Sequence, residues 1–269
     1  MRNLSREDRQ GVWIWVAVGA VVALVVGAYA YVKATRVRTD SASCVLADGS
    51  NRVLAPLAQT VFLIDQSEAF TQNQQNIILQ RIHTDLFDSL NAGDRVMVFT
   101  FSKNSYFDLV PVFSQCVPPK DVNPLIGSRS RVKYFLEAKF DRPLLKAVNA
   151  GFQEIGDESP ILEAIQDVGR SNYIDKRPGS SVRLIVVSDM LQHRAGKYTH
   201  YGHRPDFAAF RDSAYGRSVQ ANLSGWNVAV YYVARFGNGK ADQGIEHMKF
   251  WQQYFLTSGA KLASWEPVI

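Results

Sequence analysis

Val61–Thr71 reads V-F-L-I-D-Q-S-E-A-F-T, and this stretch decides the fold. Four apolar residues run without interruption into Asp65. A strand that is apolar on both faces is typical of the middle of a parallel sheet that helices cover on both sides. Asp65 is therefore expected where the chain leaves the sheet, and the carboxyl ends of such strands bind ligands in open α/β sheets.

The residues after Asp65 predict a loop and then a helix. Residues 66–75 are polar, and an apolar stripe with helical spacing follows at Ile78, Ile82, Leu86 and Leu90. Further buried strands are predicted at residues 96–101, 183–187 and 228–233, with a short last strand at 262–265. Helices are predicted at residues 131–152, with an interruption at Pro143, and at 245–256.

One strand is expected to run against the others. Residues 106–113 read as a strand that only Ser102–Ser105 separates from the strand at 96–101. A connection that short cannot form a parallel crossover, so the pair is predicted to be an antiparallel hairpin. Pro111 places its second strand at an edge. The predicted fold class is α/β, with a doubly wound, mostly parallel sheet and one antiparallel edge strand.

Residues 11–32 carry no charge, which predicts one transmembrane helix before this domain. Twenty-two residues make a helix of ~33 Å, enough to cross a bilayer core, and tryptophans and tyrosines lie near its two ends. The alternative is a signal peptide cleaved after Ala28-Tyr29-Ala30, although such apolar regions are usually shorter. The predicted organisation is a tail at 1–10, an anchor at 11–32, a linker at 33–55 and a domain at 56–269.

Membrane orientation is not decided by charge, because three basic residues precede the span and three follow it. A short basic tail before a large C-terminal domain favours a single-pass protein of the bacterial inner membrane, with the domain in the periplasm. Gly19, Ala23 and Gly27 form a small face on which spans could self-associate, although small residues are common in spans generally.

Composition bounds the remaining classes. The 30 basic and 25 acidic residues are scattered, so no nucleic-acid partner is expected. Two cysteines, Cys44 and Cys116, are too few for a disulfide scaffold or a zinc site. They form either one disulfide in an oxidising compartment or two unrelated buried thiols.

The segment D-Q-S-E-A resembles the D-x-S-x-S motif that begins the metal-ion-dependent adhesion site of von Willebrand factor A (VWA) domains. Asp65 and Ser67 match, and Ala69 stands where the family has a second serine. Ser159-Pro160 opens a segment similar to the family's T-P-L-x-x-A-L, and Asp189 matches the aspartate at the end of a later strand. The resemblance therefore implies a partly degenerate metal site made of Asp65, Ser67, Ser159 and Asp189.

Such a set of hard oxygens suits Mg²⁺, with Mn²⁺ or Ca²⁺ not excluded. In the family, the protein partner completes the metal shell with an acidic side chain. The alternative interpretation is a metal-free face on which the two aspartates stabilise loops and Ser159 caps a helix. Past Asp189, a loop carries His193, Arg194, His200 and His203, which could hold a transition metal, bind an anion or contact a partner.

These observations predict a membrane-anchored protein–protein interaction module that is assisted by a divalent metal. The first alternative is a metal-independent structural component of a membrane complex. The second is an enzyme that processes phosphoesters with Asp65 as the nucleophile. The chain has no G-x-S-x-G, H-E-x-x-H or P-loop motif, so the expectation is that it is not an enzyme.

Overall fold

The structure is a computed structural model of the 269-residue chain. It describes residues 6–35, 39–42, 44–46, 54, 58–67, 69–86, 89–118, 128–153, 156–236 and 242–269. Half of the predicted N-terminal tail, part of the linker and most of the predicted loop at 117–130 lie outside these ranges.

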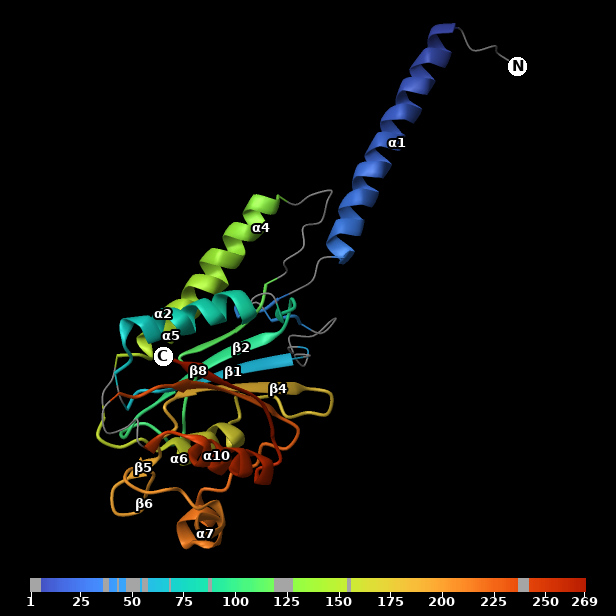
Figure 1. Ribbon diagram of the computed structural model, residues 1–269. Helices are drawn as coiled ribbons and strands as arrows, with labels where there is room; N and C mark the ends of the chain where they lie inside the picture. The colour runs from blue at the N-terminus through green and yellow to red at the C-terminus, as the bar shows by residue number, and fades with distance from the viewer. Residues whose placement is uncertain are drawn as a thin grey trace. The chain divides into compact units, whose positions relative to one another are not determined.

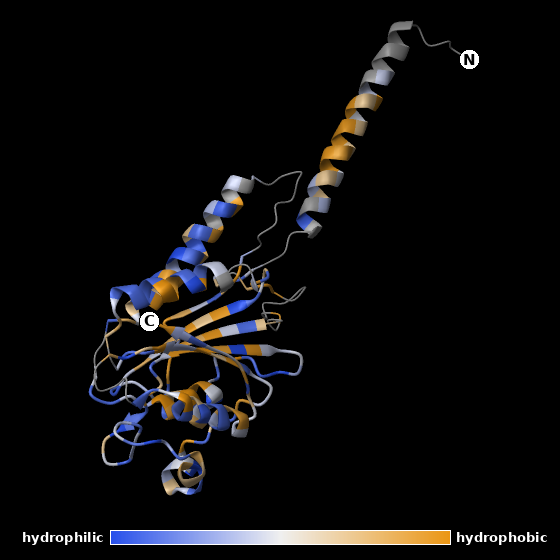
Figure 2. Ribbon diagram, viewed as in Figure 1, coloured by the Kyte–Doolittle hydropathy of each residue, from blue (hydrophilic) through white to orange (hydrophobic). Residues whose placement is uncertain are grey.

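The chain divides into two units, Met1–Thr39 and Asp40–Ile269. The second unit begins earlier than the domain start at residue 56 that the sequence suggested. The first unit contains a single described helix, α1 (Arg6–Thr35), whose middle part is apolar in Figure 2. A search of the described residues finds no helix with both the length and the hydropathy of a membrane span.

The second unit is built on a six-stranded sheet in the order β3-β2-β1-β4-β7-β8 (Figure 1). Its strands are β1 (Ala58–Asp65), β2 (Arg95–Phe101), β3 (Phe113–Cys116), β4 (Ser181–Ser188), β7 (Asn227–Val233) and β8 (Lys261–Val268). Five strands are parallel, and β3 pairs antiparallel to β2 at one edge. The predicted doubly wound sheet with one antiparallel edge strand is confirmed.

The edge strand lies further along the chain than predicted. The strand was predicted at 106–113, but residues 106–112 are a loop and β3 begins at Phe113. Asp108 takes a positive φ of 50°, and the Asp167 carboxylate accepts hydrogen bonds from the backbone N–H of Asp108 and Leu109. These contacts hold the segment as a loop, and Pro111 has no N–H to offer a sheet ladder.

Helices cover both faces of the sheet, as the continuous apolar strands predicted (Figure 1). One face packs against α2 (Gln72–Arg81) and α5 (Arg142–Ala150) around Phe62 and Ile64. The other packs against α6 (Ile161–Arg170) and α10 (Ile245–Thr257) around Val61 and Leu63.

Two of the predicted helices contain a wide turn. α2 continues as the π-helix η1 (Ile82–Leu86), and α4 (Arg129–Leu136) leads through η2 (Glu137–Asp141) into α5. Since Pro143 removes a backbone donor at the start of α5, the predicted interruption takes the form of a π turn rather than a break.

Cys44 and Cys116 form a disulfide across 72 residues of sequence. The backbone N–H of Cys116 also donates to the carbonyl oxygen of Ala42 at 2.9 Å. Residues near position 40 are thereby tied to the edge strand β3.

Candidate functional site

The predicted metal residues gather where the strand order reverses. β1 and β4 are central neighbours, and the chain continues from them toward opposite edges of the sheet. Asp65 ends β1 and Asp189 directly follows β4, and both side chains are buried. Such a topological switch point is the usual ligand site of doubly wound sheets.

Three donors hold the Asp65 carboxylate. Its Oδ1 accepts from the backbone N–H of Ser67 at 2.9 Å. Its Oδ2 accepts from the hydroxyls of Ser159 and Ser188, each at 2.8 Å. The structure thus brings Asp65, Ser67 and Ser159 together as predicted and adds Ser188. A sequence signal for Ser188 existed, because it is the last residue of an apolar strand that ends beside Asp189.

Ser159 does not cap the helix that follows it. Pro160 occupies the N-cap position of α6 and makes no side-chain cap. Gln192 serves the helix instead, since its Oε1 accepts from the backbone N–H of Leu162 at 2.8 Å. The Ser159 hydroxyl is therefore available to Asp65, and the capping interpretation is wrong.

Asp189 is paired with Arg235, a residue that the motif search did not single out. Arg235 Nε donates to Asp189 Oδ2 at 2.6 Å, and Oδ1 accepts from the backbone N–H of Leu191 at 2.8 Å. Burial raises the pKa of Asp189 to about 6, opposed by Arg235 and reinforced by the nearby Asp65 carboxylate.

Arg235 also reaches the position where the motif departs from the VWA pattern. Its Nη1 donates to the carbonyl oxygen of Ala69 at 3.0 Å. Gln243 fixes its backbone, because Gln243 Oε1 accepts from Arg235 N at 2.8 Å while Nε2 donates to the carbonyls of Asp189 and Val233. The guanidinium group is thus tied to the ends of β1, β4 and β7.

The residues present do not fit a divalent metal well. All four carboxylate oxygens of Asp65 and Asp189 already accept hydrogen bonds from protein donors. The arginine cation lies against Asp189 Oδ2, and Ala69 contributes no side-chain oxygen. Ser67 and Ser159 line a hollow of about 370 Å³ whose acidic residues, Asp157 and Glu158, are already paired with basic side chains.

The backbone beside Asp189 is strained. Met190 has a φ of 62°, which is unfavourable for a residue with a side chain. Its N–H donates to the Ser188 hydroxyl at 2.8 Å, and its carbonyl lies 2.9 Å from both His247 Nε2 and Trp251 Nε1. These contacts hold the turn that aims Asp189 at Arg235.

The loop histidines do not converge. His200 is completely buried with its Nδ1 3.1 Å from His247 Nε2, so the prediction that it contacts a partner is wrong. His203 is exposed, and its Nδ1 lies 2.7 Å from the Tyr201 carbonyl. His193 Nδ1 lies 3.0 Å from Thr199 Oγ1. Over the residues that the structure describes, no cluster of three or more His, Cys, Asp or Glu side chains could hold a metal ion.

Arg194 has a structural role in the same loop. Its Nη1 donates to Glu158 Oε2 at 2.5 Å and its Nη2 to the Tyr106 hydroxyl at 2.9 Å. The guanidinium carbon lies 4.5 Å from the centre of the Tyr106 ring. These contacts leave Arg194 poorly placed to act as a partner-binding side chain.

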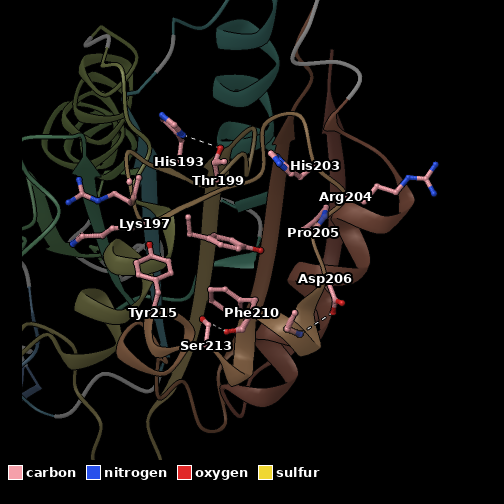
Figure 3. A pocket seen from close by; sticks show the side chains of 14 residues that line it. His193, Lys197, Thr199, His203, Arg204, Pro205, Asp206, Phe210, Ser213 and Tyr215 are labelled. Carbon is pink, nitrogen blue, oxygen red and sulfur yellow. Dashed lines mark hydrogen bonds between the residues drawn. The ribbon is translucent and has the colours of Figure 1, made fainter.

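A pocket of about 590 Å³ opens in this segment (Figure 3). The small hairpin of β5 (His193–Arg194) and β6 (Tyr198–Thr199) forms one wall, and α7 (Phe207–Asp212) and α8 (Ala214–Ser218) contribute others. Its aromatic lining is Tyr198, Phe210 and Tyr215. Lys197 and Arg204 are exposed at its rim, and Arg204 extends outward in Figure 3.

No family model matches the chain, and no curated protein matches it. The chain is similar to solved structures at low identity. An aerotolerance-related membrane protein from Bacteroides fragilis shares 15% identity, with 79% of this chain and 92% of that chain covered and a TM-score of 0.35.

Other solved structures are similar to the chain at comparable identity. The conserved hypothetical protein BatB from Bacteroides thetaiotaomicron shares 17% identity, with 78% of this chain and 90% of that chain covered and a TM-score of 0.36. A von Willebrand factor type A structure from Catenulispora acidiphila shares 10% identity, with 77% of this chain and 43% of that chain covered and a TM-score of 0.36.

The fold is VWA-like. The chain forms a mostly parallel sheet with an antiparallel edge strand after β2 and helices on both faces, which is the topology of that fold. Asp65, Ser159 and Asp189 lie at the switch point of that sheet.

Proposed function

We propose that this protein is a membrane-held interaction module that binds an acidic segment of a partner protein. The observation that carries the proposal is the pocket beside the switch point, with an aromatic lining and basic side chains at its rim. An apolar or aromatic anchor with neighbouring carboxylates would match such a surface, since aromatic contacts supply binding energy and charge supplies orientation.

The charges at the pocket support an acidic partner. Within the described part of the chain, neither Lys197 nor Arg204 forms an ion pair. Asp206, the acidic residue of the lining, is engaged as the N-cap of α7, where its Oδ1 accepts from Ala208 N and Ala209 N. The negative charge of Asp206 thus faces the N-terminus of α7.

The sequence suggested assistance by Mg²⁺, with Mn²⁺ or Ca²⁺ as alternatives. Because Arg235 already neutralises Asp189 and Ala69 lacks the second hydroxyl, we propose a metal-independent form of this function. The enzyme alternative gains no support from Asp65, whose buried carboxylate is occupied by three hydrogen bonds and is poorly exposed to a substrate.

Residues 11–32 are proposed to hold the module at the membrane. The support is their lack of charge and the exposure of apolar side chains along α1, from Trp13 at 71% to Tyr31 at 64%. A periplasmic location of the domain agrees with the Cys44–Cys116 disulfide, since such bonds persist in oxidising compartments. Self-association through the small face of Gly19, Ala23 and Gly27 remains a prediction.

Site-directed photo-cross-linking tests the interaction. A photoreactive residue at Ala209, which lines the pocket, is introduced into the full chain in its own membranes, and Ala150 on α5 serves as the control position. We expect a discrete cross-link at Ala209 to an acidic peptide of another protein, and none at Ala150.

Charge reversal provides the second part of this test. Lys197→Glu with Arg204→Glu should abolish the cross-link, whereas the matched reversal Lys146→Glu on α5 should leave it intact. The cross-link should also survive removal of divalent cations by a chelator. A cross-link that is unaffected by reversal of the two rim charges, or that maps to a basic peptide, contradicts the proposal.

A further inference from the structure

Arg235 belongs to the VWA-like site and does not line the pocket between the β5–β6 hairpin and α7. It follows β7, whereas the motif residues follow β1 and β4 or precede α6. Its Nε lies 2.6 Å from Asp189 Oδ2, and its Nη1 donates to the carbonyl of Ala69. It therefore bridges two of the positions that the motif assigns to the metal site.

We infer that the Arg235 guanidinium is the resident cation of this site and takes the place of a divalent metal. Asp65 and Asp189 place two carboxylates at the switch point, and the positive charge of Arg235 lies beside them. Guanidinium groups are weakly hydrated and always charged, which suits a buried ion pair. The Arg235 side chain is 11% exposed and that of Asp189 is 1% exposed.

Steric and electrostatic arguments exclude simultaneous occupation by both cations. Mg²⁺ requires about six oxygen ligands at short range. A metal bound to Asp189 would meet a guanidinium already within hydrogen-bond distance of the same carboxylate, and like charges repel. At position 69 the side-chain hydroxyl that a metal would use is absent, and the backbone carbonyl accepts from Arg235 instead.

Gln243 indicates that the arginine is positioned rather than loosely attached. It accepts from Arg235 N at 2.8 Å and donates to the carbonyls of Asp189 and Val233 at 3.1 and 2.9 Å. The ends of β4 and β7 are thereby held at the separation at which Arg235 meets Asp189.

Calorimetric titration of the detergent-solubilised full chain with MgCl₂ and MnCl₂ tests the inference. Wild type and Ala69→Ser should bind neither metal at millimolar concentration, because both keep Arg235. The double variant Ala69→Ser/Arg235→Gln should gain Mn²⁺ affinity by ~10-fold or more, the scale on which groups around a metal site act. Arg194→Gln, with Ala69→Ser, is the control, because it removes a different, partly buried arginine that is also ion-paired.

Each outcome is decisive. Mn²⁺ binding by wild type overturns the inference, and so does a folded double variant that binds no metal, since Arg235 would then not be what excludes it. If the double variant does not fold, proton exchange at Arg235 Nε–H is measured in wild type. Slow exchange that millimolar Mg²⁺ leaves unchanged supports a resident cation, and accelerated exchange in Mg²⁺ overturns it.

Discussion

The Ser159 hydroxyl donates a 2.8 Å hydrogen bond to Oδ2 of Asp65, across 94 positions of the sequence. This bond joins the loop before α6 to the end of β1. Because Ser188 donates to the same oxygen, Asp65 is the acceptor that holds together the ends of two strands and the start of a helix.

Asp65→Ala should destabilise the domain by about 3 kcal/mol, because it leaves three buried donors without their acceptor. Urea unfolding measures the change. Asp212→Ala, which removes an exposed aspartate of α7, is the control and should leave stability nearly unchanged. An unchanged unfolding midpoint for Asp65→Ala would show that the network contributes nothing.

Removal of the Arg235 charge should destabilise the domain, because it leaves the buried Asp189 carboxylate without its ion-pair partner. Arg235→Met is expected to cost about 3–5 kcal/mol, whereas Arg235→Met/Asp189→Asn should recover most of this loss because neither charge remains. A double-mutant cycle at pH 7.5 by urea unfolding gives the coupling. Strictly additive effects would mean that the 2.6 Å contact carries no coupling energy.

The buried histidines predict that stability depends on pH. Burial lowers the pKa of His247 from 6.5 to about 4, and burial together with the neighbouring His247 holds the pKa of His200 well below its usual value. Both are neutral in the folded domain, whereas the unfolded chain takes up protons below about pH 6.5. The contribution of His247 is therefore fully present above pH 6.5 and is lost as pH falls toward about 4, and the contribution of His200 has the same sign.

At pH 5 the loss from His247 should be about 2 kcal/mol relative to pH 7.5, and His200 should add a loss of the same sign. Asp189 has the opposite sign, because its raised pKa favours the folded state at lower pH, so wild type and variant must be compared. The pH-dependent loss should be smaller in His247→Gln than in wild type, and His203→Gln, at an exposed site, should match wild type. Parallel pH profiles for wild type and His247→Gln would contradict the assignment.

The disulfide should contribute to stability by restricting the unfolded chain. It closes a loop of 72 residues, for which chain-entropy arguments give ~4 kcal/mol. Cys44→Ser, Cys116→Ser and the double variant should therefore lose similar amounts, because each removes the same bond. Urea unfolding with and without reductant measures this. Alkylation of both cysteines in the native, unreduced protein would show that the bond is absent.

Much of the fold was readable from the sequence because local signals agreed with the tertiary structure. The apolar run before Asp65 needs cover on both faces, and the helices supply it. Asp65, Ser67, Ser159 and Asp189 could be grouped because parallel strands end at one edge of the sheet. Arg235 could not be found this way. It matches no motif, and its contact with Asp189 depends on how far the end of β7 is held from β4.

Two other differences between the predicted and the observed structure have similar causes. The antiparallel edge was predicted from Pro111 and the short connection, but its register depends on Asp167, a residue far along the chain that holds the preceding loop. The inward orientation of His200 depends on His247 and the aromatic residues of α10, so the loop sequence alone could not show that this histidine is buried.

Residues 11–32 are proposed to anchor the protein in a membrane, and carbonate extraction tests this. Intact protein should stay in the membrane fraction after alkaline carbonate treatment, with its N-terminus upstream of residue 11, because residues 11–32 carry no charge. Val21→Lys/Leu24→Lys should move the protein to the supernatant, since a lysine at the centre of a span costs ~2.5–3.5 kcal/mol. Val110→Lys, an exposed apolar residue of the sheet unit, is the matched control and should stay membrane-bound. A mature N-terminus near Tyr31 would identify a cleaved signal peptide, and the module would then be released rather than held.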